Sequence, residues 1–293
     1  MFAQLLRGVQ LRRISFLTEP EWQDKPWSVN KRDQHDDLVD ILLEIPRIYV
    51  DLDAVQHEES PSKVLRGAVL AVRACWRLDA KLQTWFKGFE ASVDGPLFWP
   101  ELSTPSAQAD SEKTERLSPV RYSFPGMRLG QTMVLYWTGL VTLHQQMCHL
   151  YRQLQGLAAQ VNGRPSSGGD MTCTCNDDAG AVVPMAKITA CVRHFELGQL
   201  PRLGQRQAWP TTAAQDICQS VDYFLQDEMR SLGSGVIVPP LLLVCWLLER
   251  EPGNFKREVT WVKCLLALVQ KKGSEIASCD NEEPETTPWK IRA

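Results

Sequence analysis

Residues 216–230 read DICQSVDYFLQDEMR, and their apolar side chains recur every three or four positions, which is typical of one face of a helix. Two glycines follow at Gly233 and Gly235 and predict a turn, because glycine readily adopts conformations outside the helix. Pro239 and Pro240 then favour the start of a new helix, since the first helical turn needs no backbone N–H. The stretch is a packing pattern and contains no catalytic group.

The helix predicted after these prolines is almost wholly apolar. Residues 236–248 carry no charged side chain, and a helix that is apolar on every side is buried in a globular protein. The run is only about 13 residues long, whereas a membrane span needs roughly 20, so we expect a core helix and no membrane contact. Pro252 and Gly253 predict another turn, into a last helix that contains Trp261.

Three further stretches show helical spacing of apolar residues. Residues 37–50 form one stripe that Pro46 is expected to bend or interrupt, a long helix follows from about Pro61, and another covers about 127–157. The sequence TAAQ at 212–215 predicts a capping box for the helix after it. Since no stretch shows the alternation of a strand, the predicted fold class is all-α, an irregular multi-helix domain.

A single helical domain is expected to span residues 1–293, with three segments that lack helical periodicity. Residues 95–126 gather proline, serine, threonine and charges and predict a surface loop. Residues 160–182 contain a glycine- and serine-rich break, and residues 280–293 form a polar tail. We expect these three segments to be flexible, and the structure between 160 and 210 stays open.

Charge and composition limit the classes of function. The 293 residues carry a formal charge of -3 and a pI of about 6.0, and 44% of them are hydrophobic. Dedicated nucleic-acid-binding domains usually have a basic face or a pI above roughly 9, so direct DNA contact is not expected. Arg7, Arg12 and Arg13 interrupt the N-terminal apolar residues before they reach the length of a signal peptide, which predicts an intracellular protein.

The cysteines provide one candidate metal site. Cys173, Cys175, Cys191 and His194 are four side chains of the kind that bind zinc. The spacing Cys-x-Cys is less usual than Cys-x-x-Cys, and its surroundings are a glycine-, serine- and aspartate-rich loop, so an exposed pair and a core cysteine are favoured. We therefore expect no metal and no cofactor. The other cysteines lie mostly in apolar helical patterns and are expected to be reduced.

Candidate catalytic groups have plainer explanations. His144 and Cys148 share a helix face, but the sequence supplies no third partner, so a core histidine beside a buried cysteine is favoured. The acidic pairs near Asp36, Asp51 and Glu58 fall at expected helix ends and loops, where carboxylates are common. Because signatures such as Gly-x-Ser-x-Gly and His-Glu-x-x-His are absent, we expect no enzyme activity and name no catalytic residue.

The order of these elements resembles the C-terminal regulatory domain of fungal zinc-cluster transcription factors, especially those of secondary-metabolite gene clusters. The N-terminal motifs RGVQL (7–11), FLTEPEW (16–22), PW (26–27) and DLVDILLEIP (37–46) match the family in the same order as the C-terminal stretch. The likeness covers roughly residues 5–90, 127–157 and 211–275. The DNA-binding module needs six clustered cysteines beside a basic helix, and the sequence has neither.

The resemblance implies a regulator of transcription in a fungal secondary-metabolite gene cluster, acting through protein–protein contacts. Its expected partner is a transcription factor or co-regulator, with a homodimer left open, and its expected location is the nucleus or also the cytoplasm. A truncated gene model of an ordinary factor is a further reading. The alternative from another class is a helical enzyme or ligand-binding accessory protein of the same pathway, with a pocket between helices.

Overall fold

The computed structural model describes residues 8–9, 11–28, 31–56, 61–102, 118–162, 200, 210–250 and 255–271. These residues are mostly helical, which confirms the class predicted from the sequence. The α-helices are α2 (Pro20–Asp24), α3 (Gln34–Leu42), α4 (Ile45–Gln56), α5 (Pro61–Ser92), α6 (Met127–Asn162), α8 (Pro210–Gln219), α9 (Val221–Phe224), α10 (Arg230–Arg250) and α11 (Lys256–Lys271). Short 3-10 helices are η1 (Phe16–Thr18), η2 (Lys25–Ser28) and η5 (Asp227–Met229).

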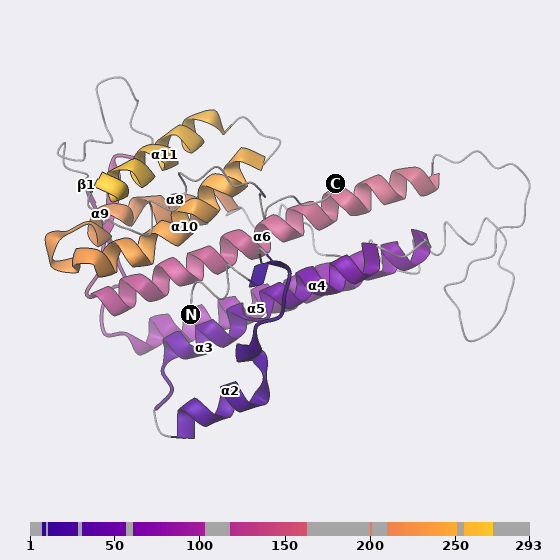
Figure 1. Ribbon diagram of the computed structural model, residues 1–293, viewed down its shortest axis with the longest axis horizontal. Helices are drawn as coiled ribbons and strands as arrows, with labels where there is room; N and C mark the ends of the chain where they lie inside the picture. The colour runs from indigo at the N-terminus through magenta and orange to yellow at the C-terminus, as the bar shows by residue number, and fades with distance from the viewer. Residues whose placement is uncertain are drawn as a thin grey trace, which may run out of the picture.

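The long helix α6 runs through the middle of the molecule (Figure 1). On one side it packs against α5 and α3, and α4 packs on α5. On the other side it packs against α8 and α10, and α11 packs on α10. Because α6 has neighbours on two sides, its buried residues exceed a single stripe, and residues 132–139 are all buried.

The N-terminal helices follow the sequence prediction closely. Asp33 caps α3: its Oδ1 accepts from the Asp36 backbone N–H at 2.9 Å, and Asp36 Oδ2 accepts from the Asp33 backbone N–H at 3.0 Å. The helix is interrupted between α3 and α4, immediately before Pro46, where the sequence predicts a bend or interruption of the apolar stripe of residues 37–50. Gly67 of α5 lies against α4, where an added Cβ would come within 2.3 Å of Val55 Cγ1.

The start of α10 differs from the prediction. The sequence predicts a turn at Gly233 and a helix that begins at Pro239, but α10 runs unbroken from Arg230 to Arg250 with Pro239 and Pro240 inside it. Gly233 serves close packing, because a Cβ there would lie 1.9 Å from the carbonyl oxygen of Phe224. The prolines cost backbone hydrogen bonds. Deep burial of the helix offsets that cost, with four residues wholly inaccessible: Ile237, Val238, Leu241 and Val244.

The amphipathic stretch before α10 is also interrupted. The structure divides it into α8, α9 and η5, although Ile217, Val221 and Phe224 are all buried as their spacing predicts. The capping box predicted at 212–215 is wrong, since α8 begins at Pro210 and Thr212 lies inside its first turn. Proline suits that position because its missing N–H has no helical partner there.

A short hairpin occupies part of the segment predicted as a surface loop, residues 95–126. Strands β1 (Trp99–Leu102) and β2 (Val120–Ser123) pair antiparallel, with Trp99 opposite Ser123 and Leu102 opposite Val120. The sequence predicts no strand, and this prediction is wrong for the hairpin. Each strand has only four residues, and their burial does not alternate, so neither strand has a recognisable pattern in the sequence.

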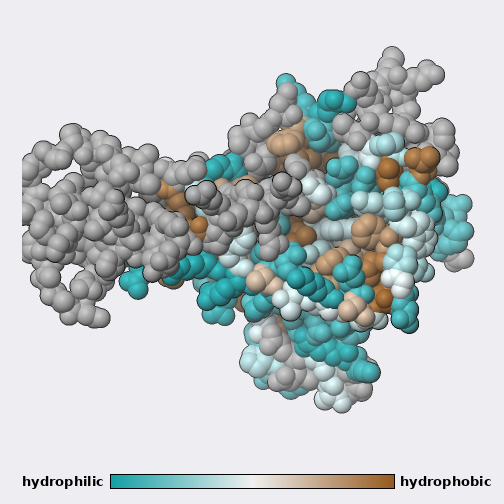
Figure 2. Space-filling model, turned by 180° about the vertical axis from the view of Figure 1, so that it is seen from behind, coloured by the Kyte–Doolittle hydropathy of each residue, from teal (hydrophilic) through white to brown (hydrophobic). Residues whose placement is uncertain are grey.

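Among the described residues, one helix, Leu232–Arg250, is long and apolar enough to cross a membrane by length and composition. Of its most apolar window, 61% is buried inside the protein, which is also what a core helix shows. The outer surface is mixed: Figure 2 shows hydrophobic residues interspersed with hydrophilic ones and gathered toward the end that carries the hairpin. Leu102 in β1, with 78% of its surface exposed, belongs to that end.

Candidate functional site

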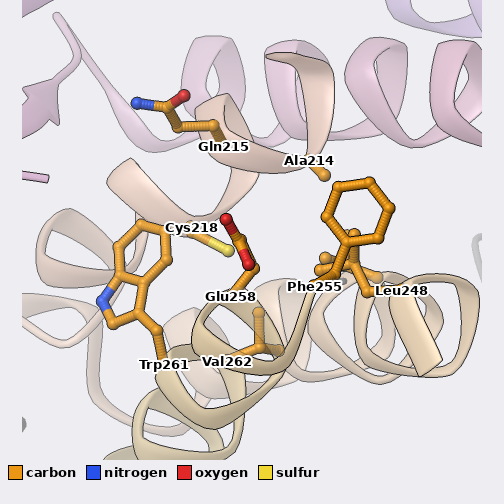
Figure 3. Close-up of a pocket in the computed structure, with 9 residues that line it drawn as sticks. Ala214, Gln215, Cys218, Leu248, Phe255, Glu258, Trp261 and Val262 are labelled. Carbon is orange, nitrogen blue, oxygen red and sulfur yellow. The ribbon is translucent and has the colours of Figure 1, made fainter. Parts of the chain in front are cut away.

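A pocket of about 330 Å³ lies between α8, α10 and α11 (Figure 3). Ala214, Gln215 and Cys218 of α8 line one side of this pocket. The rest of the wall comes from α10 (Val244 and Leu248), from Phe255 just before α11, and from α11 itself (Glu258, Trp261 and Val262). Because α11 packs on α10 and α8 packs on both α6 and α10, the pocket walls belong to helices that hold each other in place.

The walls of this pocket are mainly apolar, with one carboxylate among them. Figure 3 shows the Glu258 carboxylate lying between the Trp261 and Phe255 rings and pointing toward α8, while the Gln215 amide points away. Burial raises the pKa of the Cys218 thiol far above its ordinary value, and the neighbouring Cys245 and Asp216 act in the same direction. Cys218 is therefore an inert wall of the pocket and is not a nucleophile.

His144 lies in the core, as expected, and pairs with Asp79, but Cys148, which was expected to be buried beside it, is only half-buried. His144 Nε2 is 3.0 Å from Asp79 Oδ1, and both side chains are buried between α6 and α5. Asp79 was missed by the sequence reasoning. Asp79 follows buried Cys75 by four residues, so both lie on the apolar face of α5. This position could have indicated the pair, because a charged residue on an apolar face needs a partner.

A second polar contact joins the hairpin to α8. The Tyr122 hydroxyl donates a hydrogen bond to Asp216 Oδ1 at 3.0 Å. Burial raises the pKa of Asp216 to about 6, and the bond from Tyr122 only partly opposes that shift. Burial likewise raises the pKa of Tyr122, with the nearby Asp216 carboxylate adding to it. This contact lies outside the pocket walls and fixes the hairpin to the helices.

A wider groove of about 830 Å³ runs between the N-terminal segment and α3, α4 and α5. Its walls carry charges of both signs, many of them already paired. Arg32 forms ion pairs with Asp37 and Asp40, and Lys81 Nζ lies 2.7 Å from Glu44 Oε1. These ion pairs hold neighbouring elements together, which the sequence does not indicate. Of the acidic residues expected at helix ends, Asp36 and Asp37 lie in the first turn of α3.

The four zinc candidates, Cys173, Cys175, Cys191 and His194, lie outside the described residues, as do segment 280–293 and nearly all of 160–182. The expectation that these three cysteines and His194 bind no metal stays a prediction. Within the described part of the chain, no group of three or more His, Cys, Asp or Glu side chains is placed to hold a metal ion. The five cysteines described there form no disulfide: Cys75, Cys148, Cys218, Cys245 and Cys264.

Five tryptophans share helical stripes with leucine and valine in the sequence, which predicts core residues, and in the structure they fall into two groups. Trp85 and Trp137 are buried, whereas Trp76, Trp246 and Trp261 are half-buried. Trp76 Nε1 donates to the Tyr151 hydroxyl at 3.0 Å, the Arg250 guanidinium lies 4.2 Å from the centre of the Trp246 ring, and Trp261 lines the pocket. The half-buried group therefore meets polar partners or open space at helix edges.

Trp22 and Trp27 lie near Pro20 and Pro26 in the sequence, which predicts that they anchor an irregular N-terminal segment to the helices. Trp22 is half exposed and contacts Phe16 edge-on at 5.2 Å between ring centres. The Arg32 guanidinium lies 5.6 Å from the centre of the Trp27 ring. The Trp22 contact stays within the N-terminal segment, whereas Arg32 also pairs with Asp37 and Asp40 and so links Trp27 to α3.

Comparison with known proteins finds no matching family model, no matching curated protein and no matching solved structure. The resemblance to the fungal regulatory domain therefore depends on the motifs quoted above and on the order of the helices.

Proposed function

We propose that this chain is a regulator of transcription in a fungal secondary-metabolite gene cluster and acts through protein–protein contacts. The observation that carries the proposal is the order of the quoted sequence motifs, which resembles the family's regulatory domain. That resemblance consists of packing motifs, and its parts fall on the N-terminal elements through α5, on α6, and on α8–α11. A role in binding, rather than in chemistry, suits a chain whose polar contacts mainly hold helices together.

Several structural features support this role over an enzyme. The pocket's sulfur is an unreactive thiol, and the His144–Asp79 pair is sealed between two helices. The thiol lies on α8 and the pair lies between α5 and α6, whereas nucleophilic catalysis needs a nucleophile and a base in one cavity. The net charge of -3 agrees with a regulator that reaches promoters through another protein.

The test is deletion of the gene followed by measurement of transcript levels across its chromosomal neighbours. Loss or gain of the neighbouring transcripts, restored by the unmodified chain, is the expected result. A complementing Glu258→Gln chain separates the regulatory role from any role of the pocket, because this change leaves the helix packing in place. Unchanged neighbour transcripts in the deletion strain contradict the proposal.

A second candidate function is binding of a small ligand from the same pathway. The pocket between α8, α10 and α11 specifically favours this alternative, since it combines apolar walls with one polar group. Equilibrium binding to the purified chain tests this function without reference to transcription.

A further inference from the structure

The pocket has a charged group where an apolar pocket would ordinarily have none. Glu258 lies on the first turn of α11 and is half-buried, and its carboxylate points into the space between the Trp261 and Phe255 rings. Among the described residues, no basic side chain lines the pocket, and the carboxylate shares it with two aromatic rings and aliphatic walls.

Two features of this arrangement attract a cation. A carboxylate in a partly dry site pairs strongly with an ammonium group, and aromatic faces add a cation–π attraction when the cation lies within about 6 Å of the ring centre. An anion is repelled by Glu258, while a neutral apolar molecule fills the walls but leaves the carboxylate partly desolvated and unpaired. The pocket therefore distinguishes ligands by charge as well as by shape.

The size and the walls restrict the ligand further. A volume of about 330 Å³ is at the lower end of ligand pockets, which run from roughly 300 to 1,000 Å³. Aliphatic contacts from Val244, Leu248 and Val262 suit one ring or a short branched chain. A large polar metabolite has too few hydrogen-bonding partners here.

We propose that the pocket between α8, α10 and α11 binds a small protonated monoamine, whose ammonium group pairs with Glu258 between Trp261 and Phe255 and whose apolar body contacts the aliphatic wall. This site is independent of the role in transcription proposed above. Glu258 also has a structural explanation, because an acidic residue in the first turn interacts favourably with the helix dipole. That explanation alone predicts no preference for amines.

The experiment compares three ligands of similar shape on the full chain: 2-phenylethylamine, 2-phenylethanol and 3-phenylpropionate. Binding is measured near neutral pH by calorimetry and by ligand-detected nuclear magnetic resonance. We expect the amine to bind at least roughly tenfold more tightly than the alcohol, and the carboxylate to bind least, as one half-buried charge pair and a cation–π contact together would give. This comparison needs no variant, so it does not depend on any variant folding.

Two variants then assign the selectivity to Glu258. Glu258→Gln keeps the size of the side chain and should reduce the amine-to-alcohol preference to about one, with little change for the alcohol. Glu249→Gln is the matched control, because Glu249 pairs with Lys263 at 2.7 Å on the same two helices but does not line the pocket. The control should keep the full preference.

Equal binding of amine and alcohol to the unmodified chain overturns the proposal, and so does an amine preference that survives Glu258→Gln. No binding of any of the three probes at millimolar concentration also overturns it. None of these results bears on the transcript measurement, so failure of this site and failure of the regulatory role are separately visible.

Discussion

Asp79 and His144 are buried together between α5 and α6, and the helices depend on both partners. We expect His144→Ala to lower the free energy of unfolding by about 3–5 kcal/mol, because it leaves the Asp79 carboxylate in the core without its imidazole partner. Lys81→Ala on the same helix α5 removes an exposed ion pair with Glu44 and should cost less than about 1 kcal/mol. Urea unfolding of both variants measures the difference. Similar losses for the two variants would contradict the assigned role of the buried pair.

Asp216 gives a prediction about pH. Its pKa is about 6 in the folded chain against an ordinary 3.8, so the folded state holds the proton more tightly and stability falls as pH rises from about 4 to 6. Above that range the cost is complete, at about 3 kcal/mol. Asp216→Asn cannot ionise and still accepts the Tyr122 hydrogen bond. We therefore expect this variant to be more stable than the unmodified chain at pH 7 and equally stable near pH 4.

The comparison must be made as a difference between the two chains, because another group titrates in the same range. Burial lowers the pKa of His35 to about 4, which makes stability rise with pH between roughly 4 and 6.5 and opposes the effect of Asp216. His35 Nδ1 lies 2.8 Å from Thr132 Oγ1, away from Asp216, so its contribution cancels in the difference. A stability difference that does not change with pH would show that Asp216 is ionised at no cost.

At the scale of helices, two glycines in α5 provide a matched pair. An added Cβ at Gly67 would meet the stiff, branched Val55 side chain of α4 at 2.3 Å, whereas a Cβ at Gly88 meets nothing within 4 Å. Alanine favours a helix interior by roughly 0.5–1 kcal/mol over glycine, so Gly88→Ala should stabilise the protein by about that amount. Gly67→Ala should instead destabilise it by about 1–3 kcal/mol, because overpacking exceeds the helix preference. Thermal unfolding of both variants decides, and a stabilised Gly67→Ala chain would show that α4 and α5 can separate at little cost.

The balance between local helix preference and packing also explains which elements could be predicted from the sequence. The long helices α5 and α6 have enough periodic apolar residues for their existence and approximate ends to be predicted. Gly233 and Pro239 misled the prediction of α10, because local preference favours a break and only the packing against Phe224 and the core keeps the helix whole. The hairpin is held by pairing across distant residues and by Tyr122 contacting α8, and local sequence contains neither contact.

The candidate pocket, like the hairpin, could not be predicted from local sequence. Trp261 was predicted to be a core residue from its apolar stripe, yet it lines an open pocket. Nothing in the sequence around Glu258 indicates a site, because a glutamate in a first helical turn is ordinary. The site arises only when α8 and α11 approach α10, so it could not be predicted from spacing within any one helix.

At the scale of the whole molecule, the net charge predicts how the chain binds DNA. The formal charge of -3 gives no general attraction to phosphates, and the arginines and lysines that line the wide groove lie among carboxylates, with Arg32 and Lys81 held in ion pairs. We expect the purified chain to show no sequence-specific binding to promoter DNA of the neighbouring genes at physiological salt. Fluorescence anisotropy with labelled promoter duplexes, repeated at low salt, measures this. Weak binding that disappears with salt would agree with the expectation, because non-specific contacts are electrostatic. A specific complex with a dissociation constant near about 10 nM, as dedicated readers achieve, would show that the chain reads DNA by itself and would remove the need for a partner factor.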